Sequence, residues 1–243
     1  MIVVFAFAAL ALAADNAGGP VAVRTAYEEL RDAIYNSETP DRFVALYERA
    51  IDVLGDVDLP EADRLLWRSR IEYMVARGYQ AVEDKKQAIA HYESGISFLD
   101  RLQPDRVSSE SWRMTSECVS QLCLLKSTAY VITNGPKVST YAEKALALDP
   151  RNAAAKVIIA AAKVYPPAMF GGNPKRGIEL MQDALATGTA DRDDLFNIYS
   201  GIGLAYGKLK DTENARRWLE KALELYPGNA FAREEYRKLT AGT

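Results

Sequence analysis

The side chains that most often perform catalytic chemistry are scarce in this chain of 243 residues. The one histidine, His91, lies in a helical stretch without a nucleophile beside it, and we expect it at the surface or at a groove edge. The two cysteines, Cys118 and Cys123, are about 140° apart around a helix, so a disulfide between them would require the helix to break. We expect two half-buried core thiols. One histidine and two separated thiols do not form a zinc site, so neither a catalytic residue nor a metal site is predicted.

Phosphate-binding and acid/base patterns are also incomplete. Gly171-Gly172 lacks the Lys-Ser/Thr of a phosphate loop and does not follow a strand. The carboxylates of Asp193-Asp194 and Glu234-Glu235 are adjacent in sequence, so on a helix they point about 100° apart. They are typical of helix-start charges or a solvated helix face rather than a catalytic pair. The sequence therefore predicts neither enzymatic activity nor a cofactor.

The most specific pattern lies in residues 196–229. Gly203 and Ala215 are small at positions where two helices must cross closely, and Pro227 closes the unit. The positions around them carry Tyr199, Ile202, Tyr206, Leu219 and Ala222. This pattern resembles the tetratricopeptide repeat (TPR), a helix-turn-helix unit of about 34 residues. Because one such unit cannot bury its own apolar face, the resemblance implies neighbouring units.

The same spacing can be extended along the chain. It gives repeats near 24–57, 69–102, 119–152, 155–190 and 196–229, with a polar capping helix at 230–241. The first unit is degenerate, because Arg31 and Phe43 stand where small residues are expected. In the third unit, residues 105–133 are expected to form one helix, with Asn134-Gly135-Pro136 as the turn. The resemblance implies an all-α fold, a right-handed superhelical α-solenoid of about five hairpins in a single domain spanning 19–243.

The charge of the chain gives little information about its partner. It has 30 basic and 33 acidic residues, a formal net charge of -3, and these residues are mixed along the sequence. The sequence has no basic block of the kind that would indicate nucleic acid as a partner.

The N-terminus indicates export. Met1 to Ala13 is an uninterrupted apolar run, too short to span a bilayer but suitable for the core of a secretory signal, and Ala11-Leu12-Ala13 fits signal peptidase. A secretory signal normally has a Lys or Arg before its apolar core, and this run has none. We interpret residues 1–18 as a signal peptide and disordered segment of a periplasmic protein that does not stay inserted in the membrane after cleavage. The alternatives are an uncleaved anchor, or an apolar first helix under the solenoid, which would leave the protein in the cytoplasm.

The TPR resemblance implies a concave side lined by the first helix of each hairpin. The candidate residues for a partner-binding groove are Arg70, Tyr73, Arg77, Ser127, Tyr130, Asn197 and Lys208. Arg70 and Arg77 could hold a carboxylate or an acidic segment, and the tyrosines offer apolar bodies with polar tips. The alternative is a solvated groove whose arginines pair locally with Glu72 or Asp84. The Asn and Lys placements of the chaperone-type carboxylate clamp are absent.

The turn from Pro166 to Pro174 is longer than the repeat requires. It can be an insertion whose prolines end one helix and whose Asn173-Pro174 begins the next. It can also project Met169 and Phe170 as an apolar finger toward a ligand or partner. The loop resembles one in the periplasmic TPR proteins associated with TRAP transporters. This resemblance implies that the protein is a trimeric or partner-bound module that admits a small apolar ligand.

Two functions remain open from the sequence. The first is a scaffold in the bacterial cell envelope that holds an extended segment or helix of another protein. The second is a small-ligand-binding component of a periplasmic transport system, and a homo-oligomer is compatible with either. An open concave groove would favour the scaffold, whereas a closed pocket lined by Met169, Phe170 and aromatic side chains would favour the ligand carrier.

Overall fold

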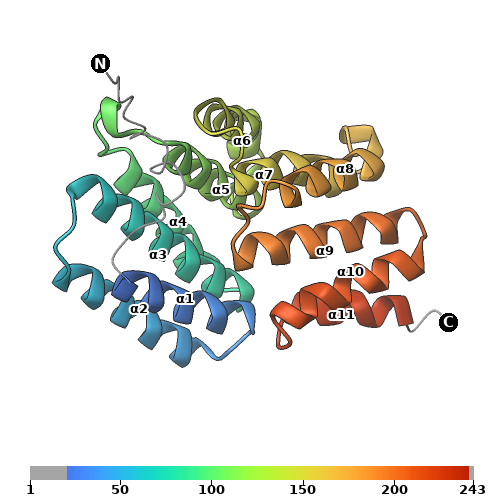
Figure 1. Ribbon diagram of the computed structural model, residues 1–243, viewed down its shortest axis with the longest axis horizontal. Helices are drawn as coiled ribbons and strands as arrows, with labels where there is room; N and C mark the ends of the chain where they lie inside the picture. The colour runs from blue at the N-terminus through green and yellow to red at the C-terminus, as the bar shows by residue number, and fades with distance from the viewer. Residues whose placement is uncertain (1–20, 241–243) are drawn as a thin grey trace, which may run out of the picture.

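The computed structural model describes residues 21–240, apart from the side chain of Phe170. The predicted signal peptide at 1–18 lies outside the described residues. The described chain is all-α, without a strand, as expected (Figure 1). Its helices are α1 Val21–Tyr35, α2 Pro40–Asp56, α3 Glu61–Ala81, α4 Lys85–Leu99, α5 Ser109–Leu125, α6 Thr128–Leu148, α7 Ala153–Val164, α8 Pro174–Leu185, α9 Arg192–Lys208, α10 Thr212–Leu225 and α11 Ala230–Thr240, with short 3-10 turns η1 Pro104–Arg106 and η2 Ala168–Phe170.

Polar residues at the helix starts explain where many of these helices begin. Asp84 accepts a hydrogen bond from the Gln87 backbone N–H at 3.1 Å, and Asn152 caps α7 in the same way. These side chains satisfy backbone donors that have no partner within the helix. Pro40 and Pro174 stand in the first turns of α2 and α8, where a missing N–H costs nothing.

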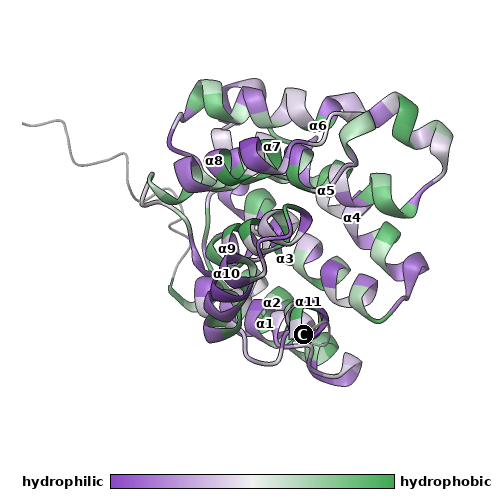
Figure 2. Ribbon diagram, turned by 90° about the vertical axis from the view of Figure 1, so that its right-hand side faces the viewer, coloured by the Kyte–Doolittle hydropathy of each residue, from purple (hydrophilic) through white to green (hydrophobic). Residues whose placement is uncertain are grey.

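The helices pair as five hairpins, each packing mainly on its sequence neighbour, with α11 against the last hairpin. Apolar and polar residues are mixed along the helices (Figure 2), and most helices bury one apolar side, whereas α3 is buried around most of its circumference. One close crossing joins α9 and α10. A Cβ at Gly203 would lie 2.8 Å from Leu219 Cγ and 3.2 Å from the Ala215 carbonyl oxygen, so only glycine fits there.

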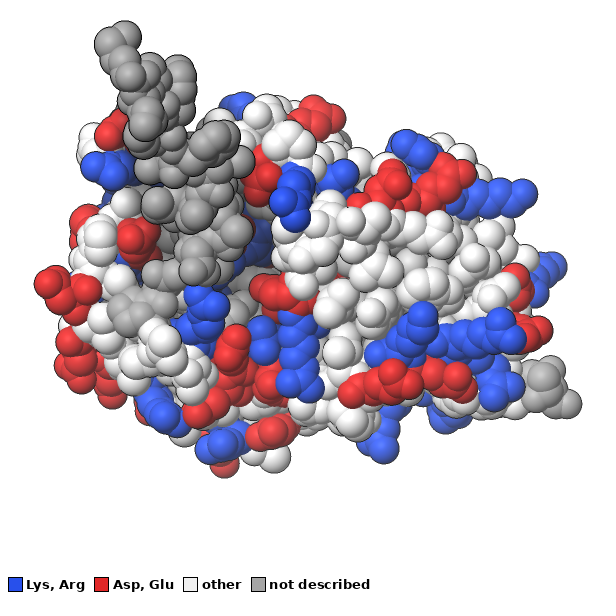
Figure 3. Space-filling model, in the orientation of Figure 1, with Lys and Arg blue, Asp and Glu red and all other residues white. Residues whose placement is uncertain are grey.

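The array curls until its first hairpin meets its last. The Asn229 side-chain amide donates to the Tyr35 carbonyl at 2.7 Å, and the Gly228 N–H donates to Asn36 Oδ1 at 3.1 Å. One hydrophobic core runs through this contact. It contains buried residues of α1, α2 and α3 together with Phe196, Ala222, Tyr226 and Ala232. The two ends lie side by side in Figure 1, and charged side chains of both signs gather at the middle of this face of the molecule (Figure 3). The solenoid is therefore closed on itself rather than open-ended.

The third hairpin differs from the expected one. Its turn lies at Lys126-Ser127, because the Ser127 side chain accepts from the Tyr130 N–H and starts α6 there. The expected turn at Asn134-Gly135-Pro136 is instead inside α6. The proline is tolerated because the first half of α6 is solvent-accessible, so the carbonyl left without its N–H partner can bind water. The third repeat, expected at 119–152, is thus formed by the hairpin of α5 and α6 at 109–148.

Candidate functional site

Three of the predicted groove residues share one face of α3. Arg70, Tyr73 and Arg77 are three and four residues apart, which places them in line along the helix. The face points toward α5 and α1, which both pack on α3. The three side chains have different surroundings, and these decide what each can bind.

Arg70 is fully engaged inside the protein. Its Nε donates to Glu110 Oε1 on α5 at 2.8 Å, and a second guanidinium N–H donates to the same oxygen. The guanidinium also lies 5.1 Å from the centre of the Trp67 ring. Burial raises the pKa of Glu110, but Arg113 and Arg70 outweigh that effect and lower it to about 2. The charge of Arg70 is therefore neutralised by Glu110 of the protein itself. Neither of the partners considered from the sequence, Glu72 and Asp84, forms this pair.

Arg113 and Glu117 extend this network along α5. Arg113 donates through Nε to Glu110 Oε2 at 3.0 Å and through Nη1 to Glu117 Oε2 at 2.8 Å. Burial raises the pKa of Glu117, and Arg113 only partly offsets it. Sequence reasoning missed these residues because the third repeat was set ten residues too late, although Glu110, Arg113 and Glu117 have the three- and four-residue spacing of one helix face.

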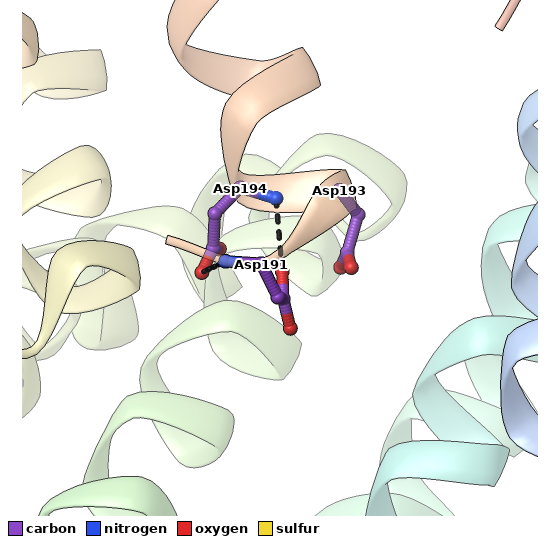
Figure 4. A group of neighbouring side chains, drawn as sticks. All are labelled: Asp191, Asp193 and Asp194. Carbon is purple, nitrogen blue, oxygen red and sulfur yellow. Dashed lines mark hydrogen bonds between the residues drawn. The ribbon is translucent and has the colours of Figure 1, made fainter. Parts of the chain in front are cut away.

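Three aspartates gather at the start of α9 (Figure 4). The Asp194 N–H donates to Asp191 Oδ1 at 3.2 Å, and the Asp191 N–H donates to Asp194 Oδ2 at 3.4 Å, which forms a reciprocal helix cap. Burial and the nearby Asp191 raise the pKa values of Asp193 and Asp194. The pKa of Asp191 is lowered, because hydrogen bonding and the charges of Arg70 and Arg113 outweigh burial.

These aspartates also form the one carboxylate group in the described chain that could hold a metal ion, with ligand atoms all within 4.8 Å of one another. Each carboxylate already has a role. Asp191 and Asp194 cap α9, and Asp193 Oδ1 lies 3.5 Å from the Arg31 Nη1 of α1. Because Asp191 and Asp194 bind backbone donors and Asp193 pairs with Arg31, we assign the group to helix capping and closure of the array.

Arg31 contributes to this closure from the first helix. It lies where the first repeat would normally have a small residue, and its side chain reaches both Asp32, at 3.0 Å, and Asp193. Beside it, the Tyr35 and Tyr226 rings stack with centres 4.7 Å apart, and Arg192 pairs with Asp32 at 3.0 Å. The departure from the repeat pattern in the first unit thus joins that unit to the last.

Arg77 lies among tyrosines. Its Nη1 donates to the Tyr73 hydroxyl at 3.3 Å, and its guanidinium lies 5.8 Å from the centre of the Tyr35 ring. It is also within electrostatic reach of Tyr165, which follows α7 and is 52% exposed. This region therefore combines a cation, aromatic rings and access to solvent on the inner side of the array.

The comparisons with known proteins agree with this architecture. The family model described as Tetratricopeptide repeat matches residues 196–229, which are α9, α10 and the connection to α11. Residues 196–229 therefore form a tetratricopeptide repeat. No curated protein sequence matches it.

Two solved structures are similar to this chain. TTC0263, a thermophilic TPR protein of Thermus thermophilus, is 17% identical, with 90% of this chain and 97% of that one aligned at a TM-score of 0.54. It supports the fold. YrrB, a TPR protein with an unusual peptide-binding site, is 14% identical over 81% of this chain and 83% of its own, at a TM-score of 0.37. That similarity is too low to support an argument about this chain.

Two predicted groove residues on α9 hold other helices in place. Lys208 donates to the carbonyl oxygens of Val164 and Tyr165, at 2.6 and 2.7 Å, and so caps the C-terminal end of α7. The Asn197 amide donates to the Tyr35 hydroxyl at 3.4 Å. Both lie near the inner side, but their polar groups are engaged.

Ser127 and Tyr130 do not lie on the first helix of a TPR hairpin, contrary to the expectation. They stand at the start of α6, the second helix of its hairpin, because the turn precedes them. The Ser127 side chain is used as the helix cap, and Lys126 Nζ lies 4.8 Å from the centre of the Tyr130 ring. The structure does not bring these two residues together with Arg77.

The long loop after α7 projects Met169, which is 83% exposed. The turn is tight, since a Cβ at Gly172 would lie 1.9 Å from the Pro166 carbonyl oxygen. A separate groove of about 300 Å³ lies between α9, α10 and α11, and Met169 is not among the residues that line it. None of the helices in the described part of the chain combines the length and hydropathy needed to cross a membrane.

Proposed function

We propose that this TPR protein is a non-enzymatic scaffold that binds a segment of another protein on the inner side of its array. The observation that carries the proposal is the group formed by Tyr73, Arg77 and Tyr165. Arg77 donates to the hydroxyl of the buried Tyr73 at 3.3 Å and lies within electrostatic reach of the half-exposed Tyr165, and arginine and tyrosine are enriched where proteins bind partners. The repeat fold supports the same role, because solenoids present an extended concave surface.

We also propose that the scaffold acts in the bacterial cell envelope. The support is the apolar run from Met1 to Ala13, which ends in the small-x-small pattern Ala11-Leu12-Ala13. Mass spectrometry of the protein purified from its own cells tests this proposal. We expect a mature form that begins after Ala13 in the periplasmic fraction. An intact Met1 on a cytoplasmic protein would contradict export.

The ligand-carrier alternative depended on Met169 and Phe170 lining a closed pocket. Met169 is largely exposed, and the groove between α9 and α11 does not include it. The scaffold is therefore the function that we put forward.

Site-specific photo-crosslinking in the native cells tests the scaffold. A benzophenone amino acid in place of Tyr165, on the inner side, should give a crosslinked partner protein that mass spectrometry can identify. The matched control carries the same group in place of Ile132, which is 72% exposed on α6. We expect the adduct from position 165 alone. The same adduct from both positions, or from Ile132 only, would place the binding surface elsewhere.

A further inference from the structure

We propose that two copies of this chain form a dimer by exchanging their halves at the contact that closes the array. The N-terminal half is α1–α6, and the C-terminal half is α7–α11 (Figure 1). In the dimer, the N-terminal half of each copy packs against the C-terminal half of the other. The surface of the second copy is one that this chain already fits, because each chain makes the same contact within its own closed array.

The hydrophobic cores follow this division into halves. One core joins α3, α4 and α5 within the N-terminal half, and another joins α7, α8 and α9 within the C-terminal half. A third core crosses between the halves at the closure, where Phe196 and Tyr226 pack with α1, α2 and α3. None of these three cores joins α6 to α7, although the two helices follow each other in the chain.

The joint between α6 and α7 is built from small side chains. The buried residues of α6 are Ala142 and Ala145, and α7 begins with buried alanines at 153–155. A buried alanine removes far less apolar surface from water than the buried ring of Tyr226 does at the closure. A hydrogen bond from the Asn152 amide to Ser109 Oγ, at 2.9 Å, crosses the joint. We therefore expect the joint to open at a lower cost than the closure.

The connection between the halves has the form of a hinge. It consists of residues 149–152 and includes Pro150, whose ring restricts the backbone. Short connections of this kind favour the exchange of identical elements between copies, because the same contacts form whether the halves belong to one chain or to two.

Polar pairs at the closure make the exchanged contact specific. Arg31 Nη1 lies 3.5 Å from Asp193 Oδ1, and the Ala230 N–H donates to Ser37 Oγ at 3.0 Å. Fixed polar pairs around an apolar core select the complementary surface and disfavour others. A second copy of this chain carries that complement in full.

The exchange also gives both copies a part in each partner-binding surface. Tyr73 and Arg77 belong to the N-terminal half, whereas Tyr165 follows α7 in the C-terminal half. In the dimer, Tyr73 and Arg77 therefore meet Tyr165 of the partner subunit. Two such surfaces in one dimer bind two segments at once, which raises the avidity for a partner that carries both.

Two charge-reversed variants of the full chain test the exchange. Arg31→Asp brings a second acidic side chain to Asp193, and Asp193→Arg brings a second cation to Arg31. Like charges then meet at the closure, both in the monomer of each variant and in its own dimer. In an exchanged heterodimer of the two variants, the new aspartate meets the new arginine at one closure, and the wild-type pair forms at the other.

Native mass spectrometry measures the species after the variants are refolded from urea, together and separately, at high protein concentration. We expect the heterodimer to exceed either homodimer about tenfold or more in the mixture, because only the heterodimer avoids like charges. The control combines Arg31→Asp and Asp193→Arg in one chain. It restores opposite charges within each copy and should give the same fractions of monomer and dimer as the wild type.

Each outcome decides for or against the exchange. A heterodimer that forms when neither variant folds alone, as judged by circular dichroism, supports it as strongly as one formed by two folded variants. A mixture without heterodimer overturns the proposal. A dimer present to the same extent in the wild type and in both single variants also overturns it, because its interface would lie outside the closure. Crosslinking from position 165 is a separate measurement, so the scaffold function stands or fails independently of the exchange.

Discussion

Arg31 on the first helix lies 3.5 Å from Asp193 Oδ1 at the start of α9, although the two residues are far apart in sequence. Their contact joins the first hairpin to the last, together with the Asn229–Tyr35 hydrogen bond and the shared core around Tyr226. A chain of hairpins that contact only their neighbours has no such pair. The stability and the shape of this protein should therefore depend on the contact between its ends.

Arg31→Gln tests this dependence. The variant leaves Asp193 buried without its cation, and losing one partner of a buried pair typically costs about 3–5 kcal/mol. We expect about 2–3 kcal/mol, because Asp193, whose pKa burial already raises, can take up a proton instead of remaining charged. Urea unfolding measures the loss, and small-angle scattering should show a larger radius of gyration.

Arg42→Gln is the matched control for Arg31. Arg42 forms an exposed pair with Glu38 at 3.6 Å, and such pairs contribute at most about 1 kcal/mol. If Arg31→Gln cost no more than this control and left the scattering unchanged, the closure would depend on the other contacts between the ends and not on Arg31.

Tyr226 carries much of that apolar contact. Its ring is fully buried and stacks on Tyr35, with Phe196 at a centre distance of 5.5 Å. We expect Tyr226→Ala to destabilise the protein by about 3–5 kcal/mol in urea unfolding, since it leaves a cavity where the two ends meet. Phe231→Ala, a ring that is 46% exposed on α11, should cost less than half as much. Equal losses would argue against a shared core between the ends.

Glu110 should give the protein a specific sensitivity to acid. Because its folded-state pKa is lowered from 4.5 to about 2, it stabilises the fold above pH 4.5, and that contribution is lost as the pH falls toward 2. The shift corresponds to about 3 kcal/mol. Glu110→Gln should therefore be less stable than the wild type by roughly that amount at pH 7, and the difference should largely disappear near pH 2.

Unfolding free energies at both pH values measure this convergence. The raised pKa values of Asp193 and Asp194 act in the opposite direction: they favour the folded state at low pH, and that contribution is lost as the pH rises above 3.8. Both proteins share this effect, so it cancels in the difference. A difference in unfolding free energy between wild type and Glu110→Gln that stays constant from pH 7 to pH 2 would show that the two arginines do not stabilise the charged form of Glu110.

The helical fold was predictable because it rests on local spacing. Gly203, Ala215 and Leu219 are packing residues, and their intervals identify the hairpin wherever it occurs. The third hairpin was misplaced because Asn134-Gly135-Pro136 is a strong turn signal in sequence, whereas the serine cap at Ser127 is weak. On an exposed helix the proline could be accommodated.

The closure of the array was not predictable from the same spacing. Arg31 and Asp193 are ordinary charged residues in sequence, and only the accumulated curvature of five hairpins brings them together. The same holds for Arg70 and Arg77, which were equivalent candidates on one helix face. A carboxylate on another helix, Glu110, neutralises the first and not the second.

Gly203 and Gly207 provide a matched pair of substitutions within α9. At Gly203 an added Cβ would lie 2.8 Å from Leu219 Cγ, so Gly203→Ala must push the α10 hairpin partner away. We expect a net loss of about 1–2 kcal/mol, because overpacking exceeds the gain in helix propensity. At Gly207 the nearest such contact is Leu239 Cδ2 at 4.0 Å, which is ordinary packing, so Gly207→Ala should stabilise by up to about 1 kcal/mol. Urea unfolding of both variants measures the opposite signs, and a stabilising Gly203→Ala would show that the α9–α10 crossing can open without cost.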